Sequence, residues 1–135
     1  MTNIEKCGDH AALIGRLFLS SMFLLFGYAK ITSFAGTVGY MGSLGLPAPA
    51  LFTALAIIIE IGGGLLVLVG YQTRLVALGL AIYVLVSSFI AHLHFGDPNE
   101  FQHFMKNMAI VGGSLAFAAF GGGAYSLDAR RSHAP

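Results

Sequence analysis

Four long apolar runs alternate with short polar segments along the chain. The runs cover about residues 11–31, 50–70, 75–93 and 101–120. A helix of about 20 residues is roughly 30 Å long, which matches the hydrocarbon thickness of a bilayer. We therefore expect an all-α integral membrane protein with a single domain over residues 1–135. The four runs are predicted to form an antiparallel four-helix bundle.

The second run contains one ionisable residue, Glu60, which is the eleventh of the 20 residues 50–69. A charge at that depth costs at least a few kcal/mol, so an intramembrane acid indicates a binding or proton-handling site. The alternative is a structural carboxyl group that is protonated or paired with a cation. Gly62–Gly64 follow directly and permit a close neighbouring helix. We therefore expect Glu60 to face the bundle interior.

Polar and small residues of the first run fall on one helical stripe. The stripe has the spacing +4, +3, +4, +3 and consists of Arg16, Ser20, Phe23, Gly27 and Lys30. We expect it to face the bundle; the alternative is that both cations extend to the lipid head groups. By helix rise, Arg16 lies about 7–8 Å from Glu60 along the axis. A long side chain covers that distance, so Arg16 is one expected partner of Glu60.

The fourth run begins with a helix-start signal, because Asp97 stands at the N-cap, Pro98 at N1 and Glu100 at N3. His103 and then Lys106 or Asn107 continue one stripe into the membrane. Lys106 is the second expected partner of Glu60.

The third run ends near His92. Together with His103, Asp97 and Glu100 it matches no strong zinc spacing, so no metal site is expected. A histidine that hydrogen-bonds or titrates at the membrane surface is preferred. The resulting candidates for ligand binding or proton handling are Glu60, Arg16, Lys30, His92, Lys106, Asn107 and His103.

Composition supports a membrane protein and excludes several other classes. The chain is 56% hydrophobic and 10% charged, whereas soluble domains carry about 25% charged residues. The net charge of +1 gives no signature of nucleic-acid binding. The single cysteine, Cys7, excludes an intrachain disulfide and a CxxC redox pair. We expect no cleaved signal peptide, because the first apolar run is too long for one.

Basic residues predict the orientation in the membrane. With both termini cytoplasmic, five basic residues lie on the inner side and two on the outer side. The inner five are Lys6, Arg16, Arg74, Arg130 and Arg131, and the outer two are Lys30 and Lys106. The positive-inside rule favours this orientation.

The polar residues do not form a complete catalytic centre. The sequence has no Ser/His/Asp arrangement, no cysteine nucleophile and no phosphate loop. A carboxyl group, histidines and lysines surrounded by aromatic residues suit a quinone head group, a proton relay or a small polar solute. Haem and metal ions are not expected.

Several motifs in order resemble the DoxX family of small bacterial inner-membrane proteins. They are Arg16-Leu17-Phe18-Leu19 with Gly27-Tyr28-Ala29-Lys30, Gly45-Leu46-Pro47-Ala48-Pro49, Glu60-Ile61-Gly62-Gly63-Gly64 with Gly70, Lys106-Asn107, and Gly121–Asp128. The resemblance implies a four-helix inner-membrane bundle and an association with redox physiology. Some related proteins are subunits of thiosulfate:quinone oxidoreductase, and others work with oxidative-stress enzymes. The family's recurrent polar positions correspond to Arg16, Lys30, Glu60, His92, Lys106 and Asp128.

Three functions fit these observations. The first is an accessory subunit in quinone-linked or oxidative-stress processes, at most one subunit of a quinone-linked oxidoreductase. The second is a small proton or solute transporter. The third is a membrane scaffold that recruits a partner protein. The expected partners are the lipid bilayer, a redox enzyme and further copies of the chain, and no nucleic acid.

Overall fold

The computed structural model describes residues 2–132 and confirms the all-α class. It contains six helices within that range. They are α1 (Asn3–Thr32), α2 (Phe34–Ser43), α3 (Pro49–Val69), α4 (Thr73–Ala91), α5 (Pro98–Phe120) and α6 (Leu127–Ser132).

Three of the described helices, α1, α3 and α4, are long and apolar enough to cross a membrane. They contain most of the first three predicted runs. α1 begins earlier than predicted because Thr2 and Glu5 form a capping box that starts the helix at Asn3. α5 has 23 residues and contains the fourth run, but its first turns are polar and it is not one of the three. Asp97 caps α5 as predicted, accepting a hydrogen bond from the Asn99 amide.

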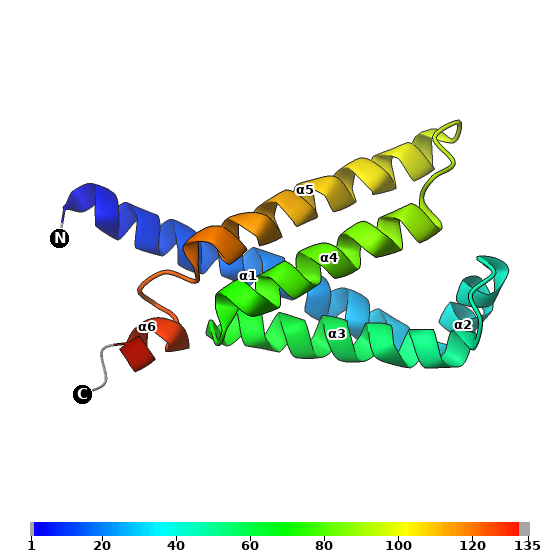
Figure 1. Ribbon diagram of the computed structural model, residues 1–135, viewed down its shortest axis with the longest axis horizontal. Coiled ribbons are helices and arrows are strands. Elements are labelled where there is room, and N and C mark those ends of the chain that lie inside the picture. The colour runs from blue at the N-terminus through cyan, green and yellow to red at the C-terminus, as the bar shows by residue number, and fades with distance from the viewer. Residues whose placement is uncertain (1, 133–135) are drawn as a thin grey trace.

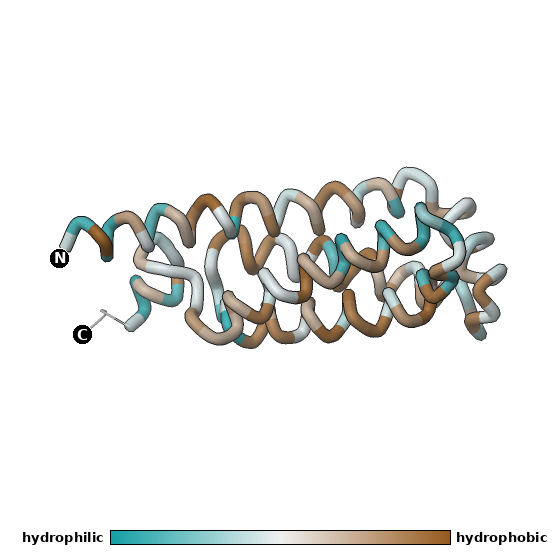
Figure 2. Tube along the Cα trace, turned by 90° about the horizontal axis from the view of Figure 1, so that it is seen from above, coloured by the Kyte–Doolittle hydropathy of each residue, from teal (hydrophilic) through white to brown (hydrophobic). Residues whose placement is uncertain are grey.

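Successive long helices run in opposite directions, and both ends of the described chain lie at the same end of the molecule (Figure 1). α1 packs along α3, and α4 packs along α5. The contact between α3 and α4 joins these two pairs. Hydrophobic residues predominate along the middle of the molecule, and hydrophilic residues gather toward its two ends (Figure 2).

Small and polar residues form much of the interior. The buried residues of α1 are Arg16, Ser20, Phe23 and Gly27, four of the five members of the predicted stripe. Those of α3 are Thr53, Ala56, Glu60, Gly64 and Val67. Only a small apolar core, formed by Phe23, Val67, Leu80 and Val84, lies between the helices. Large hydrophobic side chains instead point outward from every long helix, as expected in lipid.

The segment that joins the first two predicted runs covers residues 32–49. It contains the ten-residue helix α2, which packs against α3 and has no buried residue. The helix is followed by Gly45, whose φ of +78° suits glycine.

The end of the molecule that holds the termini is closed by the segment after α5. Gly70, which directly follows α3 and caps it, has a left-handed φ of +71°, and its carbonyl accepts from the Asp128 amide at 2.9 Å. The Asp128 carboxylate accepts from the amides of Gln72 and Thr73, both at 2.7 Å. Asp128 therefore caps α4 from 55 residues away in the sequence.

Candidate intramembrane polar site

Glu60 lies inside the bundle, where it is 5% exposed, and the prediction that it faces the interior is confirmed. Its Oε2 lies 2.9 Å from the Nζ of Lys30. Its Oε1 accepts a hydrogen bond of 2.7 Å from the Tyr83 hydroxyl. α1, α3 and α4 thus each contribute one polar side chain to a cluster, which we call the Glu60 cluster (Lys30, Glu60 and Tyr83).

Two features of the sequence place Lys30 beside Glu60. A Cβ atom on Gly27 would lie 3.2 Å from the Cβ of Glu60, so glycine at this position lets α1 approach α3 closely. Lys30 follows almost one turn later, and helical side chains lean toward the N-terminus of their helix. The Lys30 ammonium group therefore reaches back to the level of Glu60. The side chain of Lys30 is 22% exposed, whereas that of Glu60 is 7% exposed.

The structure corrects the partner expected for Glu60, which was Arg16 or Lys106. Arg16 is 2% exposed and donates four hydrogen bonds to carbonyl oxygens, those of Val67, Leu68, Gly122 and Tyr125, at 2.8–3.1 Å. The carbonyls at the end of a helix lack intrahelical partners and carry a partial negative charge. Arg16 donates to two carbonyls in the last turn of α3 and to two in the segment after α5, and so joins the two parts of the chain.

Lys106 is exposed and makes no ion pair within residues 2–132. Its neighbour Asn107 is placed differently, because its Nδ2 donates to the Ser88 Oγ at 2.9 Å. Asn107 therefore joins α5 to α4 at a buried hydroxyl group.

His92 and His103 are brought together at the end of the molecule opposite the termini. The Nδ1 of His92 lies 2.7 Å from the Oε2 of Glu100. The rings of His92 and His103 stack with centroids 5.3 Å apart. Across residues 2–132, no group of three or more His, Cys, Asp or Glu residues is arranged to hold a metal ion. This pair of histidines links the end of α4 to the start of α5.

Tyr83 is the residue of the Glu60 cluster that was not predicted as a site. It is half-buried on α4, and the sequence signal that could have found it is a single phenol within a long apolar run. A shallow groove of about 340 Å³ begins beside it and is otherwise apolar; its lining residues are Ile59, Gly63, Val76, Gly79, Leu80 and Tyr83.

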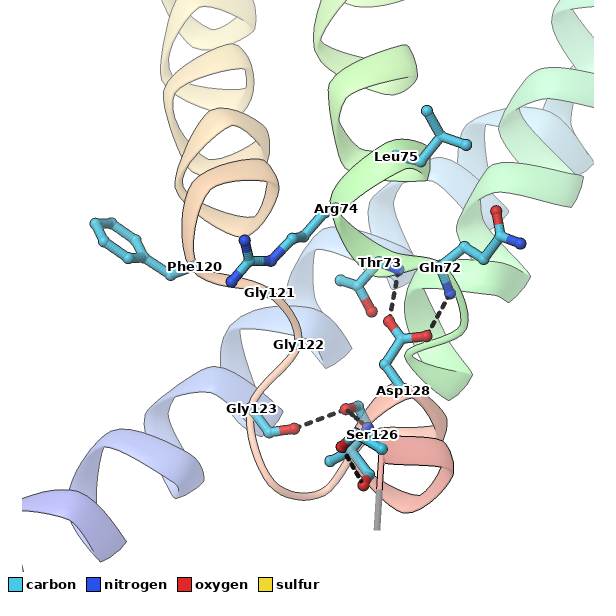
Figure 3. A pocket seen from close by; sticks show the side chains of 12 residues that line it. Gln72, Thr73, Arg74, Leu75, Phe120, Gly121, Gly122, Gly123, Ser126 and Asp128 are labelled. Atoms are coloured by element: carbon cyan, nitrogen blue, oxygen red, sulfur yellow. Dashed lines mark hydrogen bonds between the residues drawn. The ribbon is translucent and has the colours of Figure 1, made fainter. Parts of the chain in front are cut away.

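A second, larger depression of about 640 Å³ lies at the end that holds the termini, between the start of α4 and the segment after α5. Figure 3 shows Asp128 in it, bonded to the amides of Gln72 and Thr73. Burial raises the pKa of the Asp128 carboxyl, but hydrogen bonds from Thr73 and Gln72 and the charge of Arg131 outweigh it. The pKa therefore lies below its ordinary value.

Three apolar helices with a buried carboxyl group, and with a partly exposed ammonium group and a half-buried phenol bonded to it, define a small multi-spanning membrane protein with an internal polar site. The chain matches the DoxX family over residues 11–93, which include the whole Glu60 cluster, and it belongs to that family.

Named relatives agree with this assignment. The chain is 40% identical to the Escherichia coli inner membrane protein YqjF over 125 residues, 93% of this chain and 95% of YqjF. It is 38% identical to the E. coli inner membrane protein YphA, over 87% of this chain and 88% of YphA. A Bacillus subtilis protein named "Putative oxidoreductase CatD" is 32% identical over 58% of each chain. No solved structure matches the chain. The protein is thus a DoxX-family protein of the inner membrane.

Proposed function

We propose that this protein is an accessory subunit of a redox process in the inner membrane, in which the Glu60 cluster binds a quinone head group and exchanges protons with it. The observation that carries the proposal is the contact of the buried Glu60 carboxyl group with both Lys30 and Tyr83. The name of the B. subtilis relative, which describes an oxidoreductase, favours a redox role over the alternatives.

The chemistry of the cluster suits a quinone. A lysine ammonium group has three donors, and Lys30 uses one of them on Glu60. The other two are available to a quinone carbonyl oxygen, since the Lys30 side chain is partly exposed. Reduction of a quinone to the quinol takes two electrons and two protons. The Lys30 ammonium group, paired with the Glu60 carboxylate, is able to donate one of these protons, to take up another from the aqueous side that it partly faces, and to donate that second proton in turn.

The electrons have to come from a partner, since the sequence encodes no redox centre of its own. A redox enzyme in or on the membrane is therefore the partner class, and this chain is its quinone-binding or anchoring subunit. A scaffold that only recruits the partner, and a proton or solute transporter, are the competing functions.

The test is quinone binding by the protein purified in detergent. A ligand at one hundred times its Kd adds about 2.7 kcal/mol to the free energy of unfolding, so a saturating quinone is expected to raise the Tm by several degrees. Glu60→Gln is expected to remove most of this shift. Lys106→Gln, which changes an exposed lysine outside the cluster, is the matched control and is expected to retain it.

The competing functions predict other results. A scaffold shows no shift with quinone and still captures its partner after Glu60→Gln. A transporter conducts protons or solute in vesicles and loses that flux with Glu60→Gln. Either pattern, in place of a quinone shift that depends on Glu60, overturns the proposal.

We also propose that α5 crosses the membrane as a fourth helix, in an antiparallel bundle with both termini cytoplasmic. Its 23 residues form a helix about 35 Å long, and it packs along the membrane-spanning candidate α4. Its charged residues, Glu100 and Lys106, lie in the first three turns, near the surface opposite the termini, where lipid head groups and water are within reach.

A further inference from the structure

The groove beside Tyr83 opens on the surface of two helices that are both long and apolar enough to cross a membrane, α3 and α4. Its remaining lining residues are aliphatic or glycine. In a bilayer such a surface faces hydrocarbon chains and not water. The groove therefore suits a hydrocarbon chain, and the surrounding bilayer contains such chains.

Two glycines shape the groove in different ways. At Gly63 a Cβ atom would lie 2.7 Å from the Cδ2 of Leu80, so this glycine lets Leu80 pack against α3. At Gly79 no heavy atom lies within 4 Å of a built Cβ, so the space beside this glycine is open. The missing side chain at Gly79 is the feature that keeps the groove unfilled.

One end of the groove is polar. Tyr83 stands four residues after Gly79 on the same face of α4, and its hydroxyl is bonded to Glu60. From Tyr83 to Val76 the groove follows α4 for roughly 10 Å by helix rise. A hydrocarbon tail lying along the groove therefore places its head group at Tyr83, beside the other residues of the Glu60 cluster.

We infer that the ligand of the Glu60 cluster is a molecule with a hydrocarbon tail that enters from the bilayer between α3 and α4 and lays its tail in the groove. The inference rests on the proposed function and adds to it the tail, its place and the lateral route. A polar solute that arrives from water needs no such groove, so the geometry points to a lipid-soluble quinone with an alkyl or isoprenoid tail.

The test compares two probes and three proteins in detergent. The probes are decylubiquinone and the same ubiquinone head group without a tail. The proteins are the native chain, Gly79→Leu and Gly112→Leu. Both variants place leucine at an exposed helical glycine with open space around it, on α4 and α5 respectively, and leucine is the better helix former. The chain has no tryptophan and five tyrosines, so quenching of tyrosine fluorescence reports binding.

The native protein is expected to bind the tailed probe at least tenfold more tightly, since burial of only two methylene groups is worth about that factor. Gly79→Leu is expected to abolish this preference and leave binding of the tail-less probe within twofold. Gly112→Leu is expected to behave as the native protein does.

The results separate a failure of this inference from a failure of the proposed function. If the native protein binds neither probe, the proposed function and this inference both fall. If it binds both probes equally, or if Gly79→Leu keeps the tail preference, the inference falls and the proposed function stands. Loss of the preference in both variants also overturns it, because the effect is then not specific to the groove.

Discussion

At the residue scale, the Glu60 cluster balances one negative charge with one positive charge in an apolar interior. Such a pair adds little net stability, because removing both groups from water offsets their attraction. The loss of one partner is different, since it leaves the other charge buried and unpaired. Lys30 and Glu60 are therefore expected to behave as one unit.

The first prediction concerns this coupling. Glu60→Gln and Lys30→Gln are each expected to lower the free energy of unfolding by about 2–4 kcal/mol, because each leaves one charge without its partner. The double variant is expected to recover most of that loss, since two neutral amides remain. Denaturation in mixed micelles, followed by circular dichroism, measures the coupling in a double-mutant cycle.

Lys106→Gln is the control for this cycle and is expected to change the free energy of unfolding by less than about 0.5 kcal/mol, as exposed substitutions do. Additive losses in the double variant would show that Lys30 and Glu60 do not depend on each other, and would contradict the ion pair.

The second prediction concerns the pH dependence of the α4 cap. The pKa of Asp128 is lower in the folded protein, so its contribution is fully present above the unfolded value of about 4 and is lost as pH falls through the lower folded value. Asp128→Asn has one carboxamide oxygen for two amides and is expected to cost about 1 kcal/mol at pH 7. The difference in Tm between native and variant protein is expected to shrink below pH 4. A difference that stays constant from pH 7 to pH 3 would exclude an ionised cap.

At the element scale, packing depends on where glycine permits contact. At Gly70 the backbone φ is +71°, and a Cβ atom would lie 2.5 Å from the Cβ of Ser126 and 2.9 Å from its Cα. A side chain at this position would therefore strain the backbone and would also collide with Ser126, including its backbone Cα. This is where the end of α3 meets the segment after α5.

The third prediction is that Gly70→Ala lowers the free energy of unfolding by about 2–4 kcal/mol. Gly112→Ala is the matched control, since it adds the same methyl group to a helical glycine with open space around it. It is expected to gain about 0.5–1 kcal/mol through helix propensity. Thermal denaturation of the two variants measures both effects, and equal shifts would contradict the close contact at Gly70.

The periodicity of the sequence was sufficient to predict the buried faces of α1 and α3, but not that of α5, where Lys106 of the predicted stripe is exposed. The α1 stripe and the inward position of Glu60 follow from spacing within one helix, which is local information. The fold class and the start of α5 at Asp97 were predicted for the same reason.

The partners of these residues could not be predicted so well. The site of Arg16 depends on carbonyls at the end of α3 and in the segment 121–125, which only the folded chain brings together. The cap of α4 by Asp128 is equally distant in sequence. Lys30 was on the predicted stripe, but its reach along the helix toward Glu60 depends on side-chain direction and on the contact at Gly27.

At the scale of the whole molecule, the topology depends on the number of helices that cross the membrane. Both ends of the described chain lie at the same end of the structure (Figure 1), as an even number of spans requires. Among the described helices, only α1, α3 and α4 qualify as spans by length and composition. With three spans the C-terminal segment would lie opposite the N-terminal one, and with four the two would lie together.

The fourth prediction decides between these topologies. Cys7 is exposed and is the one cysteine in the sequence, so a membrane-impermeant maleimide reports the side on which α1 begins. It is expected to label Cys7 in inverted inner-membrane vesicles and not in spheroplasts, because the basic residues favour cytoplasmic termini.

Two variants that lack Cys7 complete the experiment. Cys7→Ser with Arg130→Cys, at an exposed position of α6, is expected to react from the same side as Cys7. Cys7→Ser with Ser43→Cys, at the exposed end of α2, is expected to react from the opposite side. Labelling of the α6 cysteine together with the α2 cysteine would mean that α5 does not cross. In that case α5 would lie outside the bilayer with its long apolar face exposed to water, which its large outward hydrophobic residues make energetically unfavourable. We therefore expect the four-span result.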